Sequence, residues 1–373
     1  MIIQFIVLIL KVKQIREKMR KSYIVLLFLG VFGSAFSQEF LWKAGMYSFF
    51  DNREFAGSRI NEPQTMAGVH VAPELGLGWN EKHRIFVGAN LMREFGSDEM
   101  LDYSDLIAYH EFDGKPFRFY MGAFPRRMAL EKYPRMFFQD SILNYRPLMT
   151  GIFWEHYSDE NFLNAWLDWT GRQTRERNEA FFAGLSGRYN LNLFYGQFFS
   201  YMYHFAAKKD PVIPEGLHDN GLVWVSLGIN PAKKTTFEKL EANVGWTAGL
   251  ERDRSIGEWH TPQGFLSEIK IEYKGLGLFN TYYMGEKQQA FYEDHGNQIY
   301  WGDPFYRSTG YNRADFYVYF VKTNMVNLKL IYSLHFVEKK TFHQQLFYAT
   351  FDLNNFKKKE EKKYQYIWDN WFK

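Results

Sequence analysis

Charged side chains that could act on a solute gather in residues 125–147 of this 373-residue sequence, where basic residues outnumber carboxylates among Met, Leu and Phe. The candidates are Arg126, Arg127, Glu131, Arg135, Asp140 and Arg146. Opposed charges that line a narrow aqueous passage create a transverse field, which selects solutes by charge and dipole. The basic excess would then favour anions. The alternative is a surface loop, or a segment whose ion pairs attach it to a neighbouring wall.

A second candidate segment, residues 286–310, is rich in aromatic and acidic residues. Some of its rings could stack on sugars, because aromatic faces offer apolar contact to pyranose C–H groups. The rings are Tyr292, Tyr300, Trp301 and Tyr306, and the side chains that could bond to hydroxyls are Asp294, Asp303 and Arg307. Its carboxylates and His295 could also hold Ca²⁺, but their spacing matches no calcium loop. We therefore predict solute contacts without a metal or cofactor; the alternative is an ordinary aromatic and acidic loop.

Two sequence features bear on ester hydrolysis, which at a membrane needs a Ser or His at the lipid interface and a residue that orients the base. Ser333 and His335 are two residues apart and so share one strand face, but that face is predicted to point inward. Ser186 lies in Gly-Leu-Ser-Gly, which falls short of G-x-S-x-G because Arg188 takes the last position. We therefore predict no catalytic residue and no enzyme activity, with a lipid-modifying enzyme as the less favoured alternative.

Alternating polar and apolar residues indicate the strands that would position these segments. Between residues 311 and 353 three successive runs alternate, and the second is clear. Its apolar or aromatic face carries Leu328, Leu330, Tyr332, Leu334 and Phe336, and its polar face carries Asn327, Lys329, Ser333 and His335. A period of two places successive side chains on opposite strand faces. Each run has about ten residues or more, enough for a tilted strand to cross a bilayer. The pattern is typical of a transmembrane β-barrel with a wet interior.

The same alternation recurs along the chain and predicts about 16 strands, an even number as in bacterial single-chain barrels. It is clearest in residues 236–252, where Ala242 and Val244 alternate with Glu241 and Asn243. We predict an all-β fold, a single transmembrane antiparallel β-barrel with one or two inserted loops. Its apolar faces should meet lipid, and most charged strand residues should face the lumen. The alternative is a soluble aromatic-rich β-protein such as a sandwich.

The two ends of the chain differ from the barrel pattern. Residues 1–37 contain a basic patch, an apolar run and small residues before Gln38, as in a cleaved secretory signal. We expect translation to start at Met19 and cleavage to follow Ser37. A membrane anchor is the alternative, but charges interrupt it too densely for one spanning helix. Residues 38–353 would form the barrel and residues 354–373 a charged and aromatic tail. Phe351 would then lie in the last strand, unless residues 364–372 form the closing strand.

Composition excludes several classes of site. The chain has no Cys, so it has no disulfide, no thiolate metal site and no cysteine nucleophile. Residues 1–37 hold six basic residues and one acidic residue, so their removal changes the formal net charge from +3 to −2. The basic character belongs to the leader, and nucleic-acid binding is not predicted. Aromatic residues make up 20% of the chain, and interfacial girdles would account for many of them.

The leader, the alternating strands and Gln38 at the mature start resemble outer-membrane β-barrels of the porin type, particularly those of Bacteroidota, over residues 40–353. The resemblance is one of pattern, and no motif specifies a subfamily. It implies a barrel in the cell outer membrane, in contact with the bilayer and lipopolysaccharide. Such a barrel lets small hydrophilic solutes, anionic or sugar-like, diffuse passively, and it can form a homo-oligomer. The alternative is a non-conducting structural or assembly barrel of a secretion or surface-glycan system, with a closed lumen.

Overall fold

The computed structural model describes residues 38–210, 216–255, 257–356 and 364–370. The predicted start at Met19 and cleavage after Ser37 concern residues 1–37, which lie outside the described residues. In the described part of the chain, no helix is both long enough and apolar enough to cross a membrane.

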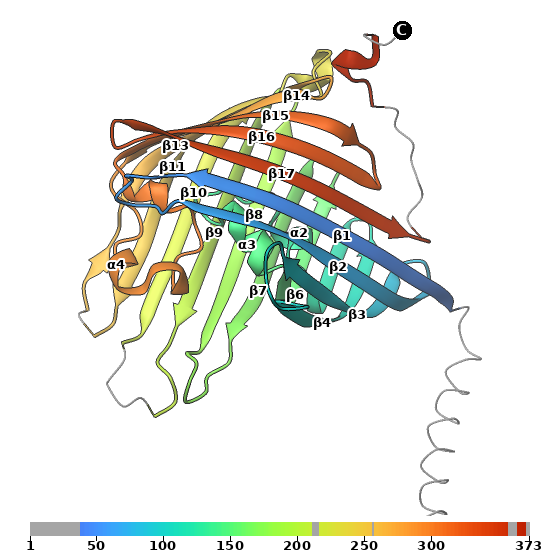
Figure 1. The fold of residues 1–373 in the computed structure, drawn as a ribbon, viewed down its shortest axis with the longest axis horizontal. Coiled ribbons are helices and arrows are strands. Elements are labelled where there is room, and N and C mark those ends of the chain that lie inside the picture. Colours follow the sequence, from blue (N-terminus) through green and yellow to red (C-terminus); the bar gives the residue numbers. More distant parts are fainter. Residues whose placement is uncertain (1–37, 211–215, 256, 357–363, 371–373) are drawn as a thin grey trace, which may run out of the picture.

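Within these residues, seventeen strands form one antiparallel sheet (Figure 1). β12 is a two-residue strand beside β11, and the other sixteen close into a barrel because β1 pairs with both β2 and β17. This confirms the predicted antiparallel barrel of about 16 strands. The bounds are β1 (Glu39–Glu54), β2 (Gln64–Trp79), β3 (His83–Glu94), β4 (Tyr103–Gly114), β5 (Phe117–Pro125), β6 (Leu148–Ser158), β7 (Asn161–Gly171), β8 (Ala180–Leu191), β9 (Phe194–Phe205), β10 (His218–Ile229), β11 (Lys239–Asp253), β12 (Trp259–His260), β13 (Gln263–Tyr273), β14 (Leu276–Gly285), β15 (Gly310–Lys322), β16 (Val326–Val337) and β17 (Lys340–Asn354).

Alternation along each strand separates an apolar outer surface from the interior. Leu227 and Val244 point outward and are 73% and 57% exposed, whereas the inward carboxylates Asp168 and Glu268 are only 1% and 4% exposed. Outward apolar groups contact acyl chains in an outer-membrane barrel, and inward polar groups find partners in the lumen. The faces are those predicted from the alternation, and His335 points inward on β16.

Most short turns gather at one end of the barrel, where β1 begins and β17 ends. Two-residue turns join β6 to β7, β8 to β9 and β13 to β14 at this end. Since short turns face the periplasm in such barrels, the opposite end is extracellular. Residues 364–370 of the tail also lie at the periplasmic end, because the Tyr366 hydroxyl accepts a hydrogen bond from the backbone N–H of Lys322 at 2.7 Å. The last strand of the barrel is β17, which ends at Asn354, the first residue of the predicted tail.

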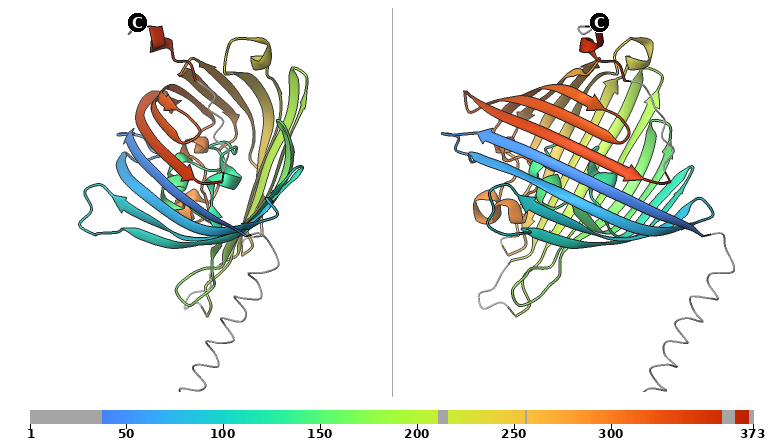
Figure 2. Two further views of the ribbon diagram at one scale, coloured as in Figure 1. Left: turned by 90° about the vertical axis from the view of Figure 1, so that its right-hand side faces the viewer. Right: turned by 45° about the vertical axis from the view of Figure 1, so that its right-hand side comes forward.

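Two long extracellular connections fold into the barrel (Figure 2). The first insert, residues 126–147, follows β5 and contains α2 (Arg127–Leu130) and α3 (Asp140–Tyr145). The second insert, residues 286–309, follows β14 and contains α4 (Tyr292–His295), η2 (Gly296–Gln298) and η3 (Pro304–Arg307). Asp303 caps η3, since its carboxylate accepts the Phe305 N–H at 3.0 Å, and Pro304 has the fixed φ that suits a helix start. Two more short helices lie outside the inserts, η1 (Ala232–Lys234) and η4 (Ile367–Asn370).

The hydrophobic core lies in the lumen, between the inserts and the inner wall of the barrel. The Phe137 and Phe138 rings of the first insert lie 5.6 and 5.7 Å from the Tyr201 ring of β9. Trp301 of the second insert lies 4.7 Å from Phe182 of β8. At this level side chains fill the lumen, because the apolar residues of both inserts are buried there. The polar interior that the alternation predicts is found around this core.

Val244→Arg should impair membrane insertion, because an arginine near the midplane of a lipid-facing barrel surface costs roughly 2–4 kcal/mol. Thr350→Arg places the same charge on an inward face and should cost less. Urea unfolding of the barrel in lipid vesicles measures both losses, and equal losses would contradict the assigned faces. Glu241→Arg is a poorer control, because the Glu241 carboxylate accepts a hydrogen bond from Arg188 at 3.0 Å.

Candidate functional site

The two inserts are joined to each other inside the barrel. The backbone N–H of Gln139 donates to the carbonyl of Trp301 at 2.8 Å, and that of Asp303 donates to the carbonyl of Arg135 at 2.9 Å. Between these two bonds, a Cβ on Gly302 would lie 2.0 Å from the carbonyl oxygen of Met136. Only a glycine permits this approach, so the inserts form a single packed unit.

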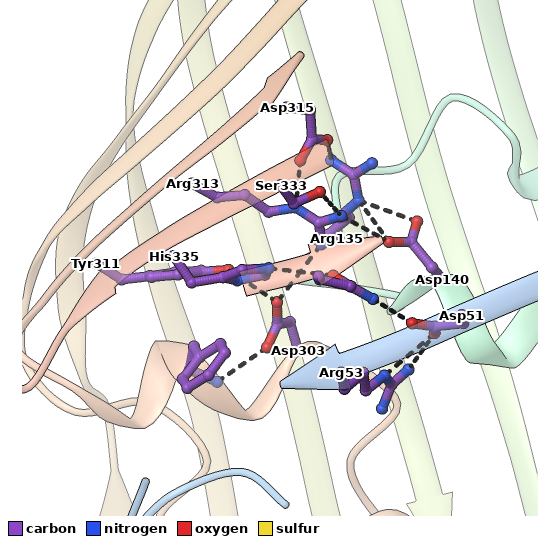
Figure 3. A network of polar contacts seen from close by, with 12 residues as sticks. Asp51, Arg53, Arg135, Asp140, Asp303, Tyr311, Arg313, Asp315, Ser333 and His335 are labelled. Atoms are coloured by element: carbon purple, nitrogen blue, oxygen red, sulfur yellow. Dashed lines mark hydrogen bonds and ion pairs between the residues drawn. The ribbon is translucent and has the colours of Figure 1, made fainter. Parts of the chain in front are cut away.

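A buried cluster of charges fixes the first insert to the barrel wall (Figure 3). Arg313 of β15 donates to Asp315 at 2.7 Å and to Asp140 of α3 at 3.1 Å. Arg135 of the insert bonds to the same two carboxylates, at 2.9 Å in each case. Burial raises the pKa of Asp140, but Arg135 and Arg313 outweigh this effect and hold it below its ordinary value. The four side chains form a closed ring of alternating charge.

A second chain of hydrogen bonds continues from this cluster across four strands. His335 Nδ1 lies 2.8 Å from the Tyr311 hydroxyl, which donates to Asp303 at 3.1 Å. His335 Nε2 lies 3.1 Å from Gln344 Oε1, and the Gln344 amide donates to Asp51 of β1 at 2.6 Å. Burial raises the pKa of Asp303, although nearby Arg313 opposes this effect. This series of hydrogen bonds links β1, β15, β16 and β17 to the second insert.

The Ser and His pair seen in the sequence is not arranged for nucleophilic catalysis. Both ring nitrogens of His335 are engaged by other residues, and the Ser333 hydroxyl instead accepts a hydrogen bond from Arg313 at 3.3 Å. Both side chains are buried. Ser186 is also buried, within strand β8, and donates to Asn164 at 2.7 Å. Neither serine has a base in position.

The first insert places its predicted constriction residues inside the barrel, but in different surroundings. Arg126 pairs with Asp168 and donates to two backbone carbonyls at 2.6 Å, and Arg135 and Asp140 belong to the buried cluster. The guanidinium of Arg127 lies 3.5 Å from the Tyr47 ring centroid, and that of Arg146 lies 4.4 Å from that of Trp301. Glu131 is exposed. A role of these residues in solute selection stays a prediction.

The second insert divides its predicted solute contacts between the core and the mouth of the barrel. Trp301 and Tyr306 are each 1% exposed, and Tyr300 donates to Glu251, so these rings are occupied by the core. Tyr292 and Arg307 line a cavity at the mouth. Asp294 is exposed, and Asp303 is buried beneath. Among the residues that the structure describes, no cluster of three or more His, Asp or Glu could hold a metal ion.

The cavity at the extracellular mouth, which we call the vestibule, has a volume of about 650 Å³. It lies between the β1–β2 connection, α3 and the second insert. Arg53, Arg59, Arg146 and Arg307 line it together with Glu62, Glu94 and Glu293. Arg307 pairs with Glu293 and Arg53 pairs with Asp51, which leaves Arg59 and Arg146 as the cations here without an ion pair among the described residues. Charge-assisted hydrogen bonds from guanidinium groups suit phosphates and carboxylates. The vestibule can therefore hold an anionic head group that approaches from outside.

A hydroxyl–carboxylate pair lies at the vestibule wall. Ser58 Oγ donates to Glu338 Oε2 at 3.2 Å and accepts the backbone N–H groups of Ile60 and Asn61, each at 3.2 Å. The two N–H donors stabilise negative charge on the hydroxyl oxygen, and the carboxylate can accept its proton. Sequence reasoning missed this pair, because 280 positions separate the two residues and neither lies in an alternating run.

Two more cavities lie further into the barrel. The middle cavity, of about 430 Å³, lies beneath the first insert, and the periplasmic cavity, of about 930 Å³, lies below it. Gln139 lines both the vestibule and the middle cavity, whereas Lys132 and Lys239 line both the middle and the periplasmic cavities. The three cavities therefore follow one another through the barrel, with a few side chains between them.

Residues 33–367 match the family described as Lipid A 3′-O-deacylase-type. The chain belongs to this family. A loop-deletion mutant of OmpT, an outer membrane protein of Vibrio cholerae, is similar in structure with a TM-score of 0.51 and 9% identity, over 85% of this chain and all of that one. OccK11 of Pseudomonas aeruginosa has a TM-score of 0.49 and 10% identity, over 85% of this chain and 96% of that one. No curated protein matches the chain in sequence.

The family corrects the expectation that the chain is not an enzyme. That expectation was wrong, because a deacylase-type family points to an enzymatic role. It rested on the inward face of the Ser333 and His335 pair and on the incomplete motif at Ser186, and both arguments considered only residues close together in the sequence. The OmpT structure supports the predicted barrel, and at 9% identity it establishes the fold alone.

Gly302→Ala should push the two inserts apart, because its Cβ has no room beside the Met136 carbonyl. Overpacking of this kind costs about 1–3 kcal/mol of folding free energy. Urea unfolding in detergent, with limited proteolysis of residues 286–309, measures the loss. Gly310→Ala is the matched control, since a Cβ there meets nothing within 4 Å. Equal stability of the two variants would contradict the tight join.

Proposed function

We propose that this chain is an outer-membrane enzyme that hydrolyses an acyl ester of lipid A. The observation that carries the proposal is the family match, which extends over all sixteen barrel strands. The reaction adds water across the ester, so the C–O bond breaks and leaves a free sugar hydroxyl and a fatty acid. An outer-membrane barrel lies in the membrane that contains this lipid, and the vestibule opens at the extracellular end, where its head groups lie.

The vestibule supplies groups that such a reaction needs. Ser58 is the proposed nucleophile, and Glu338 is the base that takes its proton as the Ser58 Oγ–acyl bond forms. The sugar oxygen leaves and takes the proton from Glu338, and water then releases the acyl group from Ser58 as a fatty acid. Arg59 and Arg146 line the same cavity and can bind phosphates of the head group. A nucleophile beside a base is the arrangement that covalent hydrolysis requires.

Lipid A from cells that produce the full chain should lose one acyl chain, as mass spectrometry of the extracted lipid would show. Ser58→Ala and Glu338→Gln should each restore the full set of chains, while Ser255→Ala, in an exposed connection outside the vestibule, should not. Unchanged lipid A with a folded wild-type barrel would contradict the proposed function. Loss of an acyl chain in Ser58→Ala would keep the function and exclude this nucleophile.

A second candidate function is the passage of small anions through the barrel. It is favoured by the succession of three cavities, in which Gln139 separates the vestibule from the middle cavity. Arg135, Lys239 and Lys329 line the middle cavity, which suits anions. This candidate continues the porin-type reading of the sequence, and it is compatible with ester hydrolysis at the mouth.

Gln139→Ala should increase the single-channel conductance of the refolded chain in a planar bilayer, because it removes the side chain between two cavities. Under a salt gradient, the sign of the reversal potential should indicate anion preference. Gln298→Ala, an exposed position on the second insert, is the control. Silent membranes with both the wild type and Gln139→Ala would exclude this candidate. Changes at Arg126 or Arg135 are less informative, because both hold the first insert in place.

A further inference from the structure

The middle cavity is a site that ester hydrolysis at the vestibule does not use. The first insert forms its roof, and strands β11 and β13 to β16 form its wall. Its volume of about 430 Å³ falls within the range of pockets that hold small molecules. It is a formed cavity, because the buried charge cluster fixes the insert above it.

One cation in this cavity lacks a counterion. Lys270 pairs with Glu268 at 3.0 Å, and Lys239 pairs with Glu272 at 3.7 Å. Among the described residues, Lys329 of β16 has no ion pair; its ammonium group instead lies 4.0 Å from the ring centroid of Tyr317. An ammonium group in a cavity that water and solutes can enter attracts an anion.

The surroundings of Lys329 add to its positive field. Lys239 and Arg135 line the same cavity and bring two more positive charges to it. Asp315 pairs with Arg135 and Arg313, and Glu272 pairs with Lys322, whereas Glu131, which lines the cavity, has no ion pair among the described residues. Six cationic side chains and three carboxylates line the cavity, so an anionic ligand would reduce its excess positive charge.

Aromatic rings determine what kind of anion fits. Phe279, Tyr317 and Tyr319 line the same wall, and the ammonium group of Lys329 also lies 5.1 Å from the Tyr319 ring centroid. Flat rings offer stacking faces, and they favour flat apolar groups over compact hydrated ions. The wall thus combines cations with aromatic rings, since Arg135 and Lys270 also lie over the Phe279 ring.

We propose that the middle cavity binds a small organic monoanion that carries a flat apolar group, with its anionic head on Lys329. The flat group packs against the aromatic wall. Access is from the periplasm, because Lys132 and Lys239 line both this cavity and the periplasmic cavity. The inference is independent of ester hydrolysis at the vestibule.

Isothermal titration of benzoate into the refolded chain, in an uncharged detergent, tests the proposal. Wild type should bind one equivalent, and it should bind cyclohexanecarboxylate and inorganic phosphate at least tenfold more weakly. Lys329→Met should weaken benzoate binding at least tenfold, while Lys329→Arg should retain it. Lys287→Met, at an exposed extracellular position, is the matched control and should leave binding unchanged.

Three outcomes would overturn the proposal. The first is the absence of saturable benzoate binding to a folded barrel. The second is binding that Lys329→Met leaves unchanged, which would place the anion elsewhere. The third is a phosphate affinity equal to that of benzoate, which would show that the aromatic wall does not favour anions with a flat apolar group. Heat-modifiable migration of each variant on gels confirms that the barrel has folded.

Discussion

The arrangement of the lumen depends on the pairing of buried charges between the first insert and the barrel wall. Arg313 on β15 and Arg135 on the insert share the carboxylates of Asp315 and Asp140. Removing Arg313 or Asp315, which are 4% and 1% exposed, would leave a buried charge unpaired, which is far costlier than the net value of the pair. The cluster therefore gives the insert one position rather than a range of positions. The vestibule above it and the middle cavity below it keep their shapes for the same reason.

Apolar side chains cover both surfaces of the barrel wall, but the outer ones contact lipid and the inner ones contact other side chains. Val244 and Leu227 face lipid, which supplies no attraction between strands beyond that of any apolar solvent, whereas Phe137 and Trp301 pack against rings inside. The stable interior is thus built by the inserts and by inward rings of β8 and β9. Polar groups line the lumen on the extracellular and periplasmic sides of this apolar interior, and both proposed binding sites lie there. This division explains why hydrolysis is proposed at the mouth and anion binding beneath the insert.

The barrel could be predicted from the sequence, because the period of two is a local property of each strand and a lipid-facing surface enforces it. The alternation in β11 and β16 was sufficient to place Val244 outward and His335 inward. The candidate site could not be predicted in the same way. The sequence identified both inserts as exceptions to the pattern, but the contact between Gln139 and Trp301 depends on how two irregular segments meet. The Ser58 and Glu338 pair joins loops from opposite ends of the chain, and no motif with a fixed spacing could have identified it in the sequence.

The hydrogen bond between Gln344 on β17 and Asp51 on β1 lies across the seam where the first and last strands meet. The same chain of contacts reaches the second insert through His335, Tyr311 and Asp303. Closure of the barrel and attachment of the second insert therefore depend on one continuous network of side chains.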